Sequence, residues 1–117
     1  MNILIVDDAS FLRMILREIL TNAGFNVIGE ATDGIDAFNK YKQLSPDLVT
    51  LDITMPYRDG LQALGDILEF DKNAKVLMCS AMGKNDFKIE AISKGALGFI
   101  TKPFIAEEVI DEVKRVI

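Results

Sequence analysis

Histidine is absent from the 117-residue sequence, and cysteine occurs once, at Cys79. Without histidine the chain has no imidazole to act as a general base, to complete a Ser-His-Asp triad or to ligate a metal ion. A single cysteine cannot form a disulfide bond within the chain. Cys79 stands inside an apolar run, so we expect a buried thiol that packs as a small hydrophobic side chain. Any metal site in this chain must therefore use oxygen ligands.

Positive charge is also scarce. The chain has 13 Lys and Arg residues against 18 Asp and Glu residues, which gives a net charge of −5. This balance argues against free-standing binding to nucleic acid, whose phosphates attract an excess of positive charge. No apolar stretch is long enough to cross a bilayer, and no signal-peptide pattern precedes Ile3. We therefore expect a cytoplasmic protein that does not interact with membranes.

Five short apolar runs alternate with five helical patterns along the chain. The runs are rich in Val, Ile, Leu and Phe, as strands buried on both faces are, and they cover residues 3–6, 26–31, 47–51, 74–79 and 96–100. Strands that alternate with helices form βαβ units and a parallel sheet with helices on both faces. No linker composition interrupts the pattern. We therefore predict an α/β fold with one domain over residues 1–117.

The helical patterns have recognisable ends. In the first, Ser10 is the candidate N-cap, and Gly24 follows the last apolar residue as a C-terminal glycine. Pro46 ends the second pattern, and the third begins near Gly60. The fourth, over residues 85–94, has no single apolar stripe. These signals predict a helix after every strand.

Polar side chains stand where four of the predicted strands end. Asp7 and Asp8 follow the first run directly, and Asp52 follows the third. Ser80 follows the fourth run, and Lys102 comes two residues after the fifth. The carboxyl ends of parallel strands lie along one edge of a sheet, where open α/β folds bind ligands. The topology therefore predicts one site with three carboxylates, a hydroxyl and an ammonium group.

Three clustered carboxylates require positive charge, because each would otherwise raise the pKa of its neighbours. Lys102 supplies one positive charge, and a divalent cation is the simplest source of more. Oxygen ligands favour a hard ion, Mg²⁺ or Mn²⁺ rather than Zn²⁺. This set suits a phosphoryl group, whose oxygens need charge neutralisation and positioning. We predict that Asp52 is the nucleophile that forms an acyl phosphate, with Asp7 and Asp8 as a metal pair.

Each of these residues also has a simpler explanation when it is taken alone. Asp7 and Asp8 would stabilise the N-terminus of the following helix through its dipole. Asp52 would pass as a loop acid, Lys102 as a solvated lysine and Ser80 as a turn residue. Their convergence on one sheet edge favours a functional site over five unrelated roles.

Four ordered motifs carry a resemblance to a known family. They are "ILIVDD" at 3–8, "LVTLDITMPYRDG" at 48–60, "LMCSAMG" at 77–83 and "FITKPF" at 99–104. In this order and at these separations they resemble the response-regulator receiver domains of two-component systems, most of all the stand-alone chemotaxis regulators. The resemblance covers essentially the whole chain. It implies a flavodoxin-like (βα)5 three-layer sandwich, with a five-stranded parallel sheet in the order 2-1-3-4-5.

The resemblance also implies roles for the acidic residues. Asp52 would accept a phosphoryl group from a phosphohistidine of a sensor kinase. Asp8 and Asp52 would ligate Mg²⁺ directly, and Asp7 would act mainly through a bound water. The main-chain carbonyl of Thr54 would complete the protein ligands.

A switch between two conformations is implied as well. Ser80 and Lys102 match the hydroxyl residue and the lysine of the family, and the bond from Lys102 to Pro103 is cis in the family. On phosphorylation, Ser80 would move toward the phosphoryl group and the ring of Phe99 would turn inward. The surface of the fourth helix, fifth strand and fifth helix would then change. Chemotaxis members carry Tyr at the position of Phe99, so a hydrogen bond through that hydroxyl is lost here.

Two positions tune the lifetime of the phosphorylated state in this family, and Thr54 and Met82 occupy them here. Neither side chain can act as a base or strongly orient an attacking water. We therefore expect slow autodephosphorylation and a need for a phosphatase partner. The other expected partners are a chemotaxis sensor histidine kinase and a flagellar motor switch or adaptor protein, and we expect the chain to be a monomer.

Two other functions compete with this one. A Mg²⁺-dependent phosphatase with an Asp nucleophile would act on small molecules, but such an enzyme needs a general acid or base near the nucleophile. Thr54 occupies the place where an Asp often stands, and the chain has no cap segment to enclose a substrate. The other alternative is a receiver domain taken from a longer response regulator. We expect a signalling switch that catalyses only its own phosphoryl transfer and slow dephosphorylation.

Overall fold

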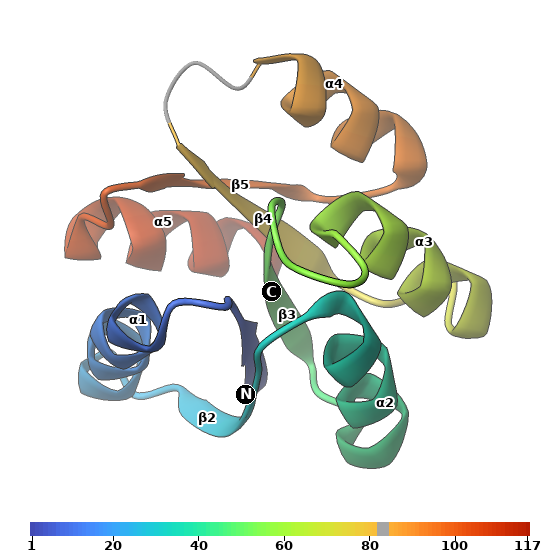
Figure 1. Cartoon of the computed structure of the whole chain (residues 1–117). Helices are drawn as coiled ribbons and strands as arrows, with labels where there is room; N and C mark the ends of the chain where they lie inside the picture. The colour runs from blue at the N-terminus through green and yellow to red at the C-terminus, as the bar shows by residue number, and fades with distance from the viewer. Residues whose placement is uncertain (82–84) are drawn as a thin grey trace.

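A five-stranded parallel sheet lies between two layers of helices in the computed structural model, which describes residues 1–81 and 85–117 (Figure 1). Met82, one of the two predicted lifetime positions, lies outside the described residues. The strands are β1 (Asn2–Val6), β2 (Asn26–Ala31), β3 (Leu48–Asp52), β4 (Val76–Ala81) and β5 (Gly98–Lys102). The helices are α1 (Ser10–Asn22), α2 (Gly34–Leu44), α3 (Gly60–Phe70), α4 (Asn85–Lys94) and α5 (Ala106–Val116).

The strands lie in the order β2-β1-β3-β4-β5, and every neighbouring pair is parallel. This order confirms the flavodoxin-like fold that the family resemblance implies. Parallel strands need a crossover connection, and the helices α1 to α4 provide these connections, while α5 follows the last strand. In this order β1 lies between β2 and β3, inside the sheet, and its carboxyl end is next to that of β3.

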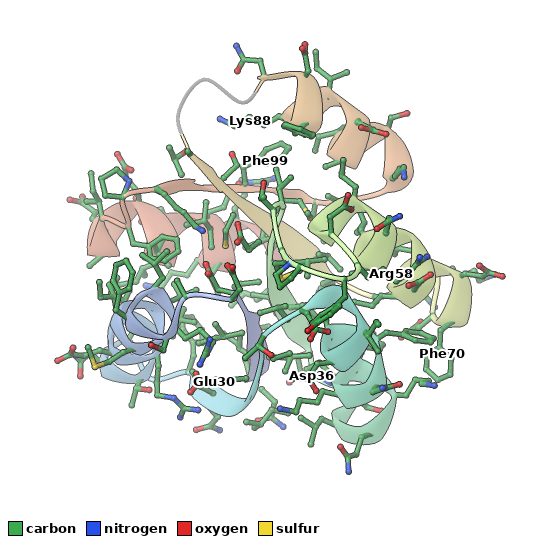
Figure 2. The ribbon with its side chains drawn as sticks, in the orientation of Figure 1. Glu30, Asp36, Arg58, Phe70, Lys88 and Phe99 are labelled. Carbon is green, nitrogen blue, oxygen red and sulfur yellow. The ribbon has the colours of Figure 1, made fainter. Side chains whose placement is uncertain are left out.

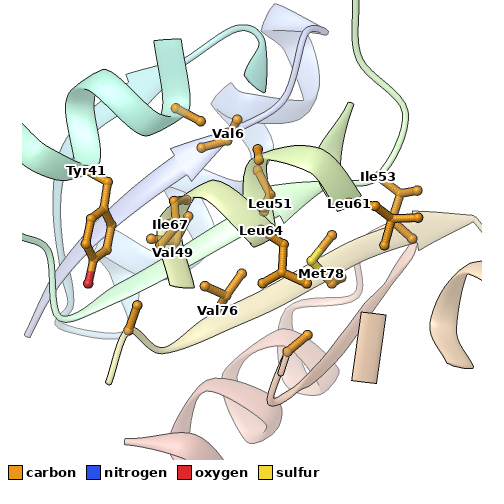
Figure 3. Close-up of a cluster of buried hydrophobic side chains, with 14 of the residues drawn as sticks. Val6, Tyr41, Val49, Leu51, Ile53, Leu61, Leu64, Ile67, Val76 and Met78 are labelled. Atoms are coloured by element: carbon orange, nitrogen blue, oxygen red, sulfur yellow. The ribbon is translucent and has the colours of Figure 1, made fainter. Parts of the chain in front are cut away.

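Helices bury both faces of the sheet. Because successive side chains of a strand point to opposite faces, the strands contribute to two hydrophobic clusters. One hydrophobic cluster lies under α2, α3 and α4, and its sheet residues include Leu4, Val6, Val49, Leu51, Val76 and Met78 (Figure 3). The other lies under α1 and α5, and its sheet residues include Ile3, Ile5, Leu48, Leu77, Cys79 and Ile100. Cys79 is buried as expected, and burial raises the pKa of its thiol.

Three strands end later than the apolar runs predict. Asp52 is the last residue of β3, Ser80 lies inside β4, and Lys102 is the last residue of β5. Backbone pairing continues through these polar residues, since Asp52 pairs with Cys79 and Ser80 pairs with Thr101. Hydrophobicity marks the buried part of a strand but not its last hydrogen bonds. Asp52, Ser80 and Lys102 are consequently held by the sheet itself rather than by loops.

The predicted helix ends are only partly confirmed. The prediction of Ser10 as the N-cap is wrong, because the helix already includes Ser10 and Ala9 is the cap. A carboxylate oxygen of Asp7 accepts a hydrogen bond from the Ala9 N–H at 2.9 Å, so this acid takes over part of the capping role. Gly24 follows Ala23, the C-cap of α1, as predicted. Its φ of +92° lies in the left-handed region, which favours glycine.

Helix α4 packs less deeply than the other elements of its layer. Ala91 is buried, whereas Ile89 is 71% exposed and Ile92 is 49% exposed. Because the apolar residues of 85–94 do not form a single stripe, the helix cannot bury all of them against the sheet. Among the described residues, no helix combines the length and apolar character needed to span a membrane.

Thr50 places a hydroxyl in the middle of the sheet. Thr50 is fully buried on β3, and its Oγ1 has no hydrogen-bond partner among the described atoms. A buried hydroxyl without a partner has lost its bonds to water and gained none in return, which destabilises the folded state.

Replacement of Thr50 by Val should therefore stabilise the protein by about 1 kcal/mol, because the shape is kept and the hydroxyl is removed. The measurement is the free energy of unfolding in urea. Thr50→Ala is the matched control, and it should be less stable than Thr50→Val because it leaves a cavity. A loss of stability in Thr50→Val would show that the hydroxyl is paired.

Glu112 joins α5 to β5. Its carboxylate accepts hydrogen bonds from Arg115 Nε at 2.7 Å and from the Phe99 N–H at 3.1 Å, while Arg115 also donates to the Leu97 carbonyl at 2.7 Å. The bond from Arg115, helped by that from Phe99, lowers the pKa of Glu112 against the opposing effect of burial. The ionised carboxylate therefore stabilises the folded state.

This contribution should depend on pH. A glutamate with a lowered folded pKa stabilises the protein above its unfolded pKa, near 4.3, and the effect fades as pH falls through the folded value. Glu112→Gln should therefore be less stable than wild type at about pH 7, and the difference should shrink at about pH 3. Urea unfolding at both pH values measures it, with Glu107→Gln, exposed on the same helix, as the control. A difference that is independent of pH would contradict the assignment.

Candidate functional site

Side chains from three strands meet at the carboxyl edge of the sheet. Asp7 follows β1, Asp52 ends β3 and Lys102 ends β5. The Lys102 ammonium donates a hydrogen bond to Asp52 Oδ1 at 3.0 Å and lies 2.9 Å from Asp7 Oδ2. Both carboxylates are almost fully buried, with Asp7 3% and Asp52 6% exposed. One lysine thus compensates two buried acids that come from different parts of the chain.

Asp8 adds a third carboxylate to this pair. One oxygen from each of Asp7, Asp8 and Asp52 lies within 4.8 Å of the others, and Asp8 is exposed while the other two are buried. The Asp7 Oδ2 atom lies in ion-pair contact with the Lys102 ammonium. Three clustered carboxylate oxygens suit a hard divalent cation. The residues therefore fit a Mg²⁺ ion.

The charges of the cluster perturb one another. Burial, followed by the charge of Asp7, raises the pKa of Asp52, and the bond from Lys102 offsets part of that rise. Burial opposes the charged form of Lys102, but its contacts with Asp7 and Asp52 outweigh burial and raise the pKa of the ammonium. Lys102 is therefore firmly protonated at neutral pH.

A cavity of about 160 Å³ opens beside Asp52. Ser80 is buried on β4, and its residue lines this cavity together with Lys102 and Thr54. The hydroxyl of Ser80 makes one long contact, of 3.4 Å, with the carbonyl of Ala81. The cavity thus brings together a carboxylate, an ammonium and a hydroxyl, the three groups that the strand ends predict.

Sequence analysis did not assign Phe87 to this cavity. Phe87 of α4 lines it, although the pattern of 85–94 suggests only a poorly packed helix. The sequence signal that could have indicated this role is the lack of a single apolar stripe in residues 85–94, because it leaves Phe87 without a predicted position in the core.

The predicted switch aromatic, Phe99, lies on β5 and packs partly buried against the hydrophobic cluster under α2, α3 and α4. The Lys88 ammonium of α4 lies 5.6 Å from the centre of its ring. Figure 2 labels both residues, between β5 and α4. The bond from Lys102 to Pro103 is cis, as the family resemblance implies.

The backbone at the start of α3 lies close against the main chain of Asp52 and Ile53. The N–H of Gly60, at the start of α3, donates to the carbonyl of Ile53 at 2.7 Å. A Cβ at Gly60 would lie 2.0 Å from the main-chain oxygen of Asp52. Asp59 and Gln62 form a capping box that starts α3 at this point. Only glycine allows this helix to begin directly against the strand that carries Asp52.

Comparison with known proteins identifies the family. The family of response regulator receiver domains matches residues 3–114, and the chain belongs to this family. It is 52% identical to the chemotaxis protein CheY of Thermotoga maritima over 114 residues, which cover 97% of this chain and 95% of that protein. The CheY of Bacillus subtilis is 51% identical over 113 residues, which cover 97% of this chain and 94% of that protein.

A solved structure has the same fold with a TM-score of 0.95. It is a chain of the CheX–CheY–BeF3–Mg²⁺ complex from Borrelia burgdorferi, which is 48% identical and is matched over 98% of this chain and 87% of that chain. The protein is therefore a receiver domain of the kind that acts as a phosphorylation switch in two-component signalling.

Substitution of Gly60 tests the close approach at Asp52. Gly60→Ala should destabilise the protein by about 1–3 kcal/mol, because the new methyl group overlaps the Asp52 main chain. The control is Gly65→Ala in the same helix, where an added Cβ meets nothing within 4 Å. That variant should be up to about 1 kcal/mol more stable, since alanine is the better helix former. Equal changes in the two urea unfolding curves would contradict the assignment.

Proposed function

We propose that Asp52 accepts a phosphoryl group from a phosphohistidine of a sensor kinase. The observation that supports this proposal is the Asp52 carboxylate beside a cavity that Lys102 and Ser80 also line. Such a set can stabilise charge on a phosphoryl group from more than one direction. This geometry and the family membership support the roles proposed for Asp52, Lys102 and Ser80.

In the proposed reaction, Asp52 is the nucleophile. A carboxylate oxygen of Asp52 attacks the phosphorus, a P–O bond forms, and the P–N bond to the donor imidazole breaks and leaves its electron pair on nitrogen. The Lys102 ammonium stays at the site and neutralises phosphoryl oxygens, while the Ser80 hydroxyl donates a hydrogen bond to one of them. Lys102 is protonated throughout, so it acts as a fixed positive charge and not as a base.

We propose that Asp7, Asp8 and Asp52 hold Mg²⁺ together with the main-chain carbonyl of Thr54. When bound, this ion supplies the positive charge that three carboxylates and a phosphoryl group require beyond that of Lys102. Asp7 and Asp52 are buried and already fixed by Lys102, and the exposed Asp8 gives the ion access from solvent.

The output of the switch is the surface of α4, β5 and α5. Ser80 lies at the cavity and Phe99 lies on the neighbouring strand against α4, so a shift of Ser80 toward a phosphoryl group would bias the ring and helix that pack nearby. The phosphorylated state would then bind a partner that the unphosphorylated state binds weakly.

The relatives indicate the pathway. Because CheY proteins of chemotaxis match almost the whole chain, we propose a CheA-like histidine kinase as donor and a flagellar motor switch or adaptor protein as receiver of the signal. A separate phosphatase would end the signal, since Thr54 offers no base near Asp52. In this role residues 1–117 act as one monomeric receiver domain in the cytoplasm, without nucleic acid or membrane.

Phosphorylation of the isolated protein tests the proposal. Incubation with acetyl phosphate and Mg²⁺ should add one phosphoryl group to wild type and none to Asp52→Asn, as read from the intact mass. Asp47→Asn is the control, because Asp47 lies just before the opposite end of the same strand. Equal labelling of Asp52→Asn and wild type would contradict the role of Asp52. Sustained turnover of p-nitrophenyl phosphate would instead favour the phosphatase.

A further inference from the structure

Arg13 connects the metal cluster to the far edge of the sheet. It lies on α1 and is only 16% exposed. Its NH1 group donates a hydrogen bond to the main-chain carbonyl of Asp7 at 2.8 Å, and its Nε donates to Glu30 Oε1 at 2.8 Å. The guanidinium thus bridges the turn after β1 and a carboxylate on β2.

Glu30 serves as the anchor for this arginine. It lies on β2 beside α1 (Figure 2), and its second oxygen accepts a hydrogen bond from Arg17 at 2.7 Å. Lys40 of α2 donates to the main-chain carbonyl of the same residue. Burial raises the pKa of Glu30, but the bonds from Arg17 and Arg13 outweigh it and lower the pKa overall. The anchor is therefore ionised and is held from two helices.

The carbonyl that Arg13 binds belongs to the peptide that joins Asp7 to Asp8. A peptide unit is planar, so fixing its oxygen also fixes the directions in which the two flanking residues leave it. The rest of Asp7 is fixed as well. Its N–H donates to the Ala31 carbonyl at 3.1 Å, and its Oδ1 accepts from the Ala9 N–H at 2.9 Å. Among the described residues, Arg13 supplies the one side-chain hydrogen bond to the peptide between the two acids.

We propose that Arg13 is a positioning residue for Mg²⁺: it holds the Asp7–Asp8 peptide so that both carboxylates converge, with Glu30 as its anchor. This inference rests on the proposed metal site. Arg13 touches neither the phosphoryl group nor the ion in this role, because both of its partners are protein oxygens.

Charge and position make opposite predictions for Arg13. If its positive charge were all that mattered, removal of the charge would leave the acidic cluster more negative and tighten Mg²⁺ binding. If Arg13 positions the peptide, its removal weakens binding, as loss of groups that orient metal ligands generally does. The sign of the change therefore decides between the two.

The experiment compares Arg13→Met with Arg17→Met, which remove the same charge from the same face of α1. Methionine keeps an unbranched apolar side chain in each case. Arg17 binds Glu30 but makes no hydrogen bond or ion pair with Asp7 among the described residues. Titration calorimetry with MgCl2 on the unphosphorylated protein should show about ten-fold weaker binding for Arg13→Met. Arg17→Met should bind within about two-fold of wild type, since its exposed charge is screened.

A second measurement needs no metal. In Mg²⁺-free buffer, amide hydrogen exchange of Ala9, whose N–H binds Asp7, should be faster in Arg13→Met than in wild type and unchanged in Arg17→Met. A purely structural loss would instead raise exchange throughout the chain.

The possible failures can be told apart. Equal or tighter Mg²⁺ binding by Arg13→Met, or equal weakening by both variants, would overturn the positioning role. If wild type itself takes up no Mg²⁺, the proposed metal site fails. Faster exchange at Ala9 in Arg13→Met alone would then still support the hold of Arg13 on the turn, and unchanged exchange would remove it too.

Discussion

The ammonium of Lys102 is the group on which the rest of the site depends. It lies within 3.0 Å of Asp52 and 2.9 Å of Asp7, both of which are almost fully buried. A buried carboxylate without compensation is costly, and two neighbouring ones are worse, because each disfavours the charged form of the other. With Lys102 in place, both acids can remain at the edge of the sheet, where we propose that they bind Mg²⁺ and that Asp52 is the nucleophile.

The fold brings these three residues together without help from long loops. Asp52 and Lys102 are the last residues of their strands, and Asp7 follows the last residue of another. The parallel arrangement aligns the strand ends, Gly60 allows α3 to start against the backbone of Asp52, and Arg13 ties the turn after Asp7 to β2. In the proposed switch, α4 and the ring of Phe99, which packs beside it, are the parts that respond.

Much of this arrangement could be predicted from the sequence, because buried strands and helix stripes have strong patterns. The polar residues after the apolar runs indicated a shared site, and the structure brings Asp7, Asp52 and Lys102 within ion-pair distance. Apolar runs do not say which strands are neighbours, so the sheet order came from the family resemblance. Ser10 was misassigned as a cap because α1 begins one residue earlier than its serine suggests, with Ala9 at the cap position, where the side chain has no oxygen to mark it in the sequence.

The residues that sequence analysis missed act through the third dimension. Arg13 and Glu30 are 17 positions apart, and no local pattern distinguishes this pair from surface charges. Phe87 lies on α4 but lines a cavity that residues of β3, β4 and β5 also line. Their roles depend on which helix lies over which strand end, and that information is absent from any window of the sequence.

The pKa of the Asp52 carboxyl in the Mg²⁺-free protein tests the role of Lys102 most directly. It can be followed by ¹³C NMR in wild type and in Lys102→Met. Burial and Asp7 should hold it above the ordinary aspartate value in wild type, and loss of the ammonium should raise it further. An Asp52 pKa that is the same in both proteins would show that Lys102 does not compensate the buried acids.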